Sequence, residues 1–169
     1  MNISNVRPTV LNRESHCITL ARSVLGRLEQ VTGHKQLPVP IETIASLCSY
    51  QVILLTTLPL ELSGIVSLDK KLIGINGKHH PRRQRFSLAH ELGHILLKHP
   101  PEARSTQDEI RRFNREADLF AAELLMPSND LRTMAVKESD LSILRMRYDV
   151  SNEALRLKLS SLEYPSRSF

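Results

Sequence analysis

Two histidines and a glutamate stand at a spacing that suits hydrolysis assisted by a metal ion. His90, Glu91 and His94 form the pattern HExxH. On a helix, residues four apart lie on one face about one turn apart, so both imidazoles can bind one metal ion. A zinc ion would polarise a scissile carbonyl and lower the pKa of a water molecule to roughly 7. Glu91 would take the proton of that water and deliver it to the leaving amine.

The pattern HExxH lies within a segment that is predicted to be a helix. The helix should begin at Pro81, because proline suits a first turn, and it should end near Lys98, before Pro100 and Pro101. Apolar residues on both sides of the pattern offer contacts to a core: Phe86, Ala89, Ile95, Leu96 and Leu97. The motif is therefore placed on a rigid element rather than in a loop.

The third metal ligand should come from the next helix, predicted over about 107–126. Catalytic zinc sites usually have three protein ligands and one open position. Glu109, Glu116 and Glu123 are seven residues apart and fall along one edge of an apolar stripe. Two alanines near the middle of the helix would allow close approach to the HExxH helix, which favours Glu116. Periodicity alone cannot choose among the three glutamates.

The remaining pattern predicts an α+β fold with a small antiparallel three-stranded sheet and a helical C-terminal half. Expected elements are an amphipathic helix over 13–33, a short helix over 41–49, a strand over 51–55, a hairpin over 63–76, and helices near 129–147 and 152–162. We divide the chain into a flexible tail (1–12), a main domain (13–137), a C-terminal helix pair packed on it (138–162) and a second tail (163–169).

Composition is that of an ordinary globular domain. The 169 residues are 41% hydrophobic and 24% charged, and the net charge is +5. No apolar run is long enough to cross a membrane, and the N-terminus lacks the apolar segment of a secretory signal. Cys17 and Cys48 lie outside any CxxC pattern, which favours reduced thiols. We therefore expect a cytoplasmic protein with no membrane contact, and scattered basic residues that form a solvated surface.

Two segments together resemble the ImmA/IrrE family of metallopeptidases: RQRFSLAHELGHILLKH and READLFAAELLMP. The similarity extends over roughly residues 35–162, through LPVPIETIA, SGIVSLDKKLIGIN and YDVSNEALRLKLSSL. The resemblance implies a zincin-like fold and a third ligand at Glu116, which would make the site gluzincin-type. By analogy, Asp118 would support the ligands. Mn²⁺ or Fe²⁺ could replace Zn²⁺ in a site of two histidines and one carboxylate.

The resemblance also implies a function. Family members resemble endopeptidases that cleave one partner, typically an Xre/Cro-type helix-turn-helix repressor, and so relieve transcriptional repression in mobile elements, phages or stress responses. Two alternatives remain open: a zinc-containing regulator that sequesters the repressor without cutting it, and a DNA-binding regulator that acts through residues 138–162. Intact Glu91 argues against pure sequestration, because a binder would not need it.

Residues 141–159 resemble a helix-turn-helix, with Ser151 as the N-cap of the second helix. Asp149 occupies the turn position where glycine is usual. The exposed face of the second helix would then consist of Asn152, Glu153, Arg156 and Lys158. Glu153 opposes phosphate contact and no dense basic row accompanies it, so DNA binding is the weaker interpretation.

Two further residues complete the sequence-based predictions. Tyr148 is a candidate to stabilise the oxyanion of a tetrahedral intermediate. His99 lies five residues beyond His94, which on a continuous helix would turn it away from the metal face, so we expect it to be exposed to solvent.

Overall fold

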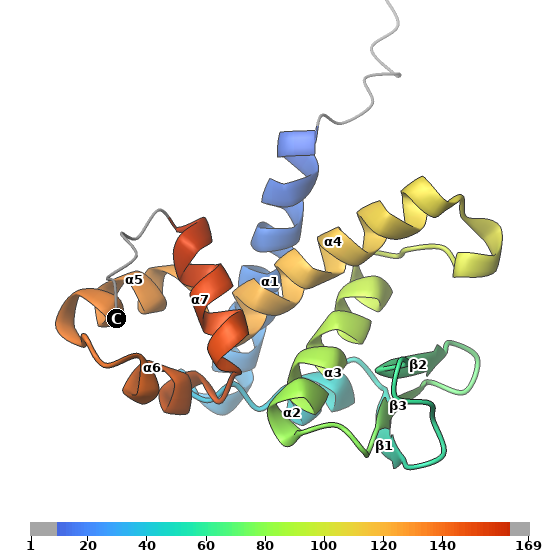
Figure 1. Ribbon diagram of the computed structural model, residues 1–169, viewed down its shortest axis with the longest axis horizontal. Helices are drawn as coiled ribbons and strands as arrows, with labels where there is room; N and C mark the ends of the chain where they lie inside the picture. Colours follow the sequence, from blue (N-terminus) through green and yellow to red (C-terminus); the bar gives the residue numbers. More distant parts are fainter. Residues whose placement is uncertain (1–9, 163–169) are drawn as a thin grey trace, which may run out of the picture.

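The computed structural model describes residues 10–162, whose elements are shown in Figure 1. The elements in chain order are α1 (Val10–Thr32), α2 (Ile41–Leu47), β1 (Gln51–Leu55), β2 (Gly64–Ser67), β3 (Leu72–Asn76), α3 (Pro81–Leu96), the 3₁₀ helix η1 (Glu102–Arg104), α4 (Gln107–Leu125), α5 (Ser128–Lys137), α6 (Leu141–Tyr148) and α7 (Asn152–Ser161). Within this described part, no helix is both long and apolar enough to span a membrane.

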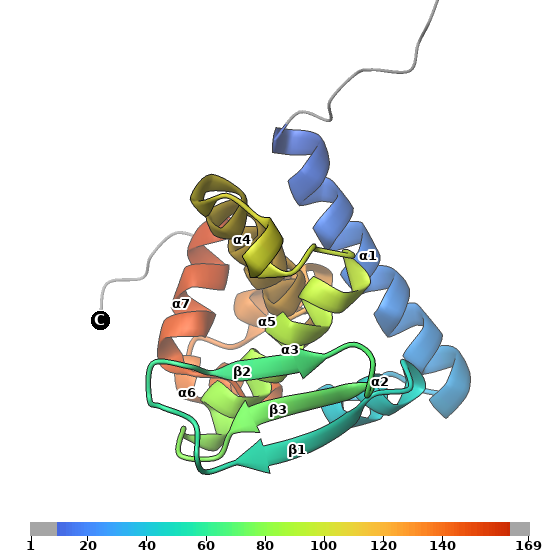
Figure 2. The same cartoon turned by 90° about the vertical axis from the view of Figure 1, so that its right-hand side faces the viewer.

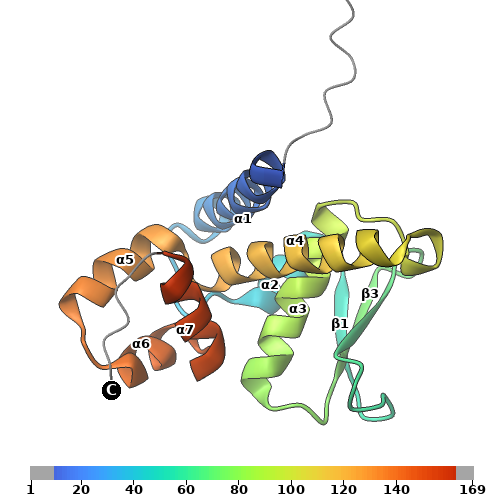
Figure 3. The same cartoon turned by 45° about the horizontal axis from the view of Figure 1, so that its top comes forward.

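Helix α3 is the central element of the fold. It packs against α4 on one side and against β2 and β3 on the other, while α1 runs along α4. Figure 3 shows α4 lying across α3, with the short helices α5, α6 and α7 gathered beyond the C-terminal end of α4. The helix that carries the HExxH pattern is therefore held between the sheet and the longest helix of the C-terminal half.

The sheet is mixed, and the prediction of an antiparallel sheet was wrong for one strand. Its strand order is β1-β3-β2, with β2 antiparallel and β1 parallel to β3. Figure 2 shows β3 between the two outer strands, with α3 behind the sheet. The hairpin of β2 and β3 was predicted correctly, because a short turn forces antiparallel pairing. The direction of β1 depends on how the chain crosses the sheet, which local alternation does not encode.

Small residues let α3 and α4 approach closely. A Cβ atom added to Gly93 would lie 3.1 Å from the Cα atom of Ala117 and 3.1 Å from Cδ1 of Phe120. Leu92, Ala117, Phe120 and Ala121 have no exposed surface. The N-terminus of α4 is fixed by a capping box, in which Thr106 and Glu109 bond each other's backbone amides. The α3–α4 contact is thus tight enough to fix which α4 side chains meet the histidines.

Two predicted boundaries were wrong. Helix α1 begins at Val10, so residues 10–12, predicted as tail, are helical; residues 1–9 and the predicted tail 163–169 lie outside the described residues. The single helix predicted near 129–147 is two helices, α5 and α6. Asp140 separates them, since its carboxylate accepts a hydrogen bond from the backbone amide of Ser142 and so starts a new helix.

The pair α6 and α7 is joined through Asp149, which has a φ of 49°. Ser151 caps α7, as predicted, by accepting a hydrogen bond from the amide of Ala154. Lys158, however, is 8% exposed, and its Nζ donates to a carboxylate oxygen of Glu123 at 2.7 Å. The prediction that Lys158 belongs to the exposed face was therefore wrong, because a buried carboxylate on α4 recruits it. The proposed DNA-reading face loses one of its two cations.

Candidate metal centre

Helix α3 brings the two motif histidines together. Nε2 of His90 lies 2.9 Å from Nε2 of His94, as the four-residue spacing on a helix requires. Two nitrogens bound to one tetrahedral zinc ion, each at about 2.05 Å, would be about 3.3 Å apart. A small rotation of either ring would satisfy that distance. The pair therefore supplies two adjacent imidazole donors of the kind that zinc prefers.

The other ring nitrogen of each histidine is already engaged. Nδ1 of His90 lies 2.8 Å from Oδ1 of Asp118, and Nδ1 of His94 lies 3.0 Å from Nδ1 of His99. Such contacts fix the orientation of a metal-binding imidazole and leave its Nε2 for the metal. Asp118, suggested by analogy alone, is thus placed against His90 by the structure.

His99 is a residue that sequence reasoning misjudged. Its side chain is 4% exposed, and its Nε2 lies 3.0 Å from Oε2 of Glu116. Its ring also stacks on Phe113, with centroids 4.5 Å apart. The expectation of an exposed His99 assumed a continuous helix, but α3 ends at Leu96 and Lys98 adopts a φ of 57°, which turns the chain back toward α4. The helix stop at Pro100 was the available sequence signal.

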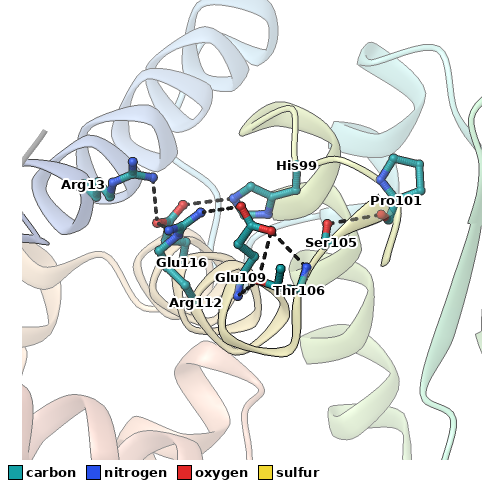
Figure 4. A network of polar contacts seen from close by, with 8 residues as sticks. All are labelled: Arg13, His99, Pro101, Ser105, Thr106, Glu109, Arg112 and Glu116. Carbon is teal, nitrogen blue, oxygen red and sulfur yellow. Dashed lines mark hydrogen bonds and ion pairs between the residues drawn. The ribbon is translucent and has the colours of Figure 1, made fainter. Parts of the chain in front are cut away.

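Glu116 contacts His99 rather than the histidine pair directly. Figure 4 shows its carboxylate among His99, Arg13 and Arg112. Its Oε1 lies 3.6 Å from a guanidinium nitrogen of Arg13 and 3.8 Å from one of Arg112, and this buried oxygen has no hydrogen-bond partner among the described residues. The assignment of Glu116 as third metal ligand stays a prediction. The contacts connect it to His94 through His99.

The other two glutamates of α4 have different surroundings. Glu109 belongs to the capping box at the start of the helix, and 42% of its side chain is exposed (Figure 4). Glu123 is fully buried and bonds Lys158, Arg22 and Ser128. Within the described residues, no hydrogen bond or ion pair joins either carboxylate to His90 or His94.

A cleft of about 960 Å³ opens over the motif. It is bounded by β2, by α3 and by the segment that leads from α3 to α4. Of the described residues of α4, Asn114 and Asp118 line this cleft, and Glu116 does not. Asn114 was not singled out from the sequence, although its position four residues before Asp118 places both on one helix face.

Glu91 lies where a catalytic base would be needed. It lines the same cleft, and its Oε1 approaches β2 so closely that a Cβ atom on Gly64 would lie 2.8 Å from it. Burial raises the pKa of Glu91, the charge of His90 opposes that rise, and Glu102 adds to it. A carboxylate with a raised pKa is a stronger base for accepting a proton from water.

The protonation state of His94 also suits metal binding. Burial lowers its pKa to about 4, with further lowering by His90 and His99, against the raising effects of Asn114 and Asp118. His94 is therefore neutral at physiological pH, the form in which an imidazole binds a metal.

Tyr148 lies elsewhere. It is fully buried, and its hydroxyl donates to Oδ2 of Asp130 at 2.6 Å. Among the described residues, the lining of the cleft does not include it. The hydroxyl already has an acceptor in α5, so Tyr148 is not brought to the place where an oxyanion would form.

The donor set fits a metal ion in part. No group of three or more histidine, cysteine, aspartate or glutamate side chains within residues 10–162 has the arrangement of a metal site. Two imidazole nitrogens converge, and their chemistry suits zinc. The nature of the third donor depends on which side chain α4 presents to them.

Comparisons with known proteins agree with this fold. Residues 48–160 match the peptidase M78 family, in the region described as the IrrE N-terminal-like domain. The chain therefore belongs to the peptidase M78 family, and the predicted membership of the ImmA/IrrE group is confirmed. Membership of this peptidase family supports a metallopeptidase-like protein with a metal cofactor, typically zinc.

A solved structure described as a Mycobacterium tuberculosis transcriptional regulator shares the fold. It matches 88% of this chain with a TM-score of 0.64 and 18% sequence identity. The match covers 48% of that protein, so the present chain spans about half its length. A comparison with curated protein sequences finds no match.

Proposed function

We propose that this protein is a zinc-dependent endopeptidase that cleaves a specific helix-turn-helix repressor of the Xre/Cro type and so relieves transcriptional repression. One observation carries the peptidase part: two Nε2 atoms 2.9 Å apart lie in the same cleft as a partly buried carboxylate, that of Glu91. This arrangement supplies metal donors and a base to one reacting centre. Family membership supports the same chemistry.

Each residue has a defined part in the proposed reaction. His90 and His94 hold the metal, and Asp118 and His99 fix the two rings through their Nδ1 atoms. Bound zinc would polarise the scissile carbonyl and acidify a water molecule. Glu91 accepts the proton of the attacking water on its carboxylate and passes it to the leaving amine. The raised pKa of Glu91 suits both transfers.

The substrate is proposed on two grounds. The cleft has a volume of about 960 Å³, which is large enough to hold several side chains of a polypeptide, and is partly lined by apolar side chains, among them Leu62, Ile65 and Phe86. The structural relative is described as a transcriptional regulator, which is consistent with a role in transcription control for this fold. Zinc is the proposed metal, and Mn²⁺ or Fe²⁺ would suit a similar donor set.

The test is co-expression with an Xre/Cro-type repressor encoded beside the protein. Wild type, Glu91→Gln and Glu102→Gln are compared, and the repressor is followed by intact mass. Glu102 lines the same cleft, so it controls for loss of a cleft carboxylate. We expect one discrete cut with wild type and Glu102→Gln, and a loss of at least about 100-fold in cleavage rate with Glu91→Gln, which should still bind zinc. Equal cleavage by Glu91→Gln would reject the mechanism.

The same samples separate the alternatives. A repressor that stays intact but co-purifies with the wild-type protein would indicate sequestration. Binding of duplex DNA that weakens steeply with salt would indicate a DNA-binding regulator. Burial of Lys158 leaves Arg156 as the exposed cation of α7 within the described residues, which weakens the case for DNA reading by that helix.

A further inference from the structure

The face that α4 turns toward the histidine pair is made by Asn114 and Asp118. The two residues are four apart on one helix, and both line the cleft together with His90 and His94. Asp118 bonds Nδ1 of His90, which fixes this face of α4 against α3. Asn114 lies one turn earlier on the same face of α4 and lines the cleft together with His94. A helix that is fixed at Asp118 therefore presents Asn114 to the second histidine.

Glu116 lies on another side of the same helix. Two residues correspond to about 200° of rotation, so Glu116 points away from the face that carries Asn114 and Asp118. Its contacts agree with that direction, because its partners are His99 and the guanidinium groups of Arg13 and Arg112 (Figure 4). A single helix cannot turn Glu116 to the cleft without removing Asp118 from His90.

We propose that the side-chain amide oxygen of Asn114, rather than a glutamate carboxylate, is the third protein donor to the metal held by His90 and His94. This inference rests on the proposed zinc site. Amide oxygens are weaker donors to zinc than carboxylates, but they are established metal ligands. Glu116 then acts as a positioning residue, which holds His99 and through it the ring of His94.

The proposal has a consequence for affinity. Two neutral imidazoles and an amide carry no negative charge, so the site attracts a dication less strongly than one with a carboxylate ligand. Replacing the amide by a carboxylate of the same shape should therefore strengthen metal binding. A gain of affinity is a more informative result than a loss, since a misfolded variant cannot produce it.

The experiment measures the Zn²⁺ dissociation constant of the full chain by competition with a chromophoric chelator, without any substrate. Wild type is compared with Asn114→Asp and with Lys98→Gln. Lys98 lines the same cleft and is exposed, so Lys98→Gln makes the same change in net charge without adding a ligand. We expect the dissociation constant to fall by about tenfold or more for Asn114→Asp and to stay within about threefold for Lys98→Gln. Equal effects of the two variants would overturn the proposal.

A second measurement identifies the ligands themselves. The visible absorption of Co²⁺ bound in place of zinc reports a change of coordinating atoms. We expect its d–d bands to change for Asn114→Asp and Asn114→Ala but not for Glu116→Gln, which keeps an oxygen for His99. A changed spectrum in Glu116→Gln with unchanged spectra in both Asn114 variants would make Glu116 the ligand.

Both measurements are independent of peptidase activity. If the protein binds zinc as expected but no repressor is cut, the proposed function fails while the assignment of Asn114 stands. If repressor is cut but neither Asn114 variant alters metal binding, the assignment fails while the peptidase function stands.

Discussion

Helix α4 carries two buried glutamates, Glu116 and Glu123, in two different regions of the molecule. Glu123 has no exposed surface, and its oxygens bond Lys158 of α7, Arg22 of α1 and Ser128 of α5. Glu116 is 8% exposed and bonds His99, but its Oε1 has no hydrogen-bond partner among the described residues. One carboxylate is fully satisfied by three other helices, and the other is not.

The difference separates a structural carboxylate from one that serves a site. The partners of Glu123 connect α1, α5 and α7 to α4, so they hold the C-terminal helices against the rest of the fold. The partner of Glu116 leads to His94 and hence to the candidate metal centre. Burial is similar in the two cases, so burial alone does not identify a functional carboxylate. A functional carboxylate is identified by which groups it bonds and by whether all of its oxygens have partners.

The largest stability effect should come from breaking the Glu123 cluster. Glu123→Ala leaves the charge of Lys158 buried, so the free energy of unfolding should fall by about 3–5 kcal/mol. Glu116→Ala should cost about 1–2 kcal/mol, because it removes one hydrogen bond and leaves Arg13 and Arg112 accessible to water. Urea denaturation of both variants checks the comparison. Equal losses would mean that the two carboxylates contribute in the same way.

A smaller loss of stability is expected from a substitution where α3 packs against α4. Gly93→Ala places a Cβ atom 3.1 Å from Cα of Ala117, so it should lower the free energy of unfolding by about 1–3 kcal/mol. Gly26→Ala, in α1, meets no atom within 4 Å and should raise it by up to about 1 kcal/mol. Thermal denaturation shows whether each substitution lowers or raises the stability of the protein. A stabilising Gly93→Ala would show that this contact is looser than described.

The smallest expected effect is a change in how the free energy of unfolding depends on acid pH when Glu123 is replaced. Burial would raise the pKa of Glu123, but hydrogen bonds from Lys158, Ser128 and Arg22 outweigh it and lower the pKa below 4.5. A depressed pKa gives stability that is fully present above pH 4.5 and is lost as the pH falls below it. Glu123→Gln should therefore lose less stability than wild type over that acid range. Parallel curves of denaturation midpoint against pH would contradict this.

Much of the local structure follows from the sequence. The HExxH segment, helix α4 and the hairpin of β2 and β3 lie where periodicity and proline predict them. Each depends on interactions between residues that are near in the chain. The family resemblance could also be recognised from the sequence, because it rests on two motifs of contiguous residues.

The wrong predictions concern features that depend on contacts between residues far apart in the chain. His99 was expected to be exposed because the helical direction was extended past Leu96, where α3 ends. Lys158 was expected to be exposed because its buried partner, Glu123, lies 35 residues away in the chain. The parallel pairing of β1 with β3 likewise depends on contacts between distant segments. So does the position of Asn114 in the cleft, which the sequence did not indicate.

By itself, the sequence determined the side chains of the candidate site on α3, two imidazoles and a carboxylate at helical spacing, because the geometry of one helix fixes their relative positions. The tertiary structure alone decided which side chains of α4 face the histidine pair. The crossing of α3 and α4 at Gly93 turns Asn114 and Asp118 toward the histidines and Glu116 toward His99. The facing side of α4 is set by packing between two helices, and no pattern within either helix specifies that rotation.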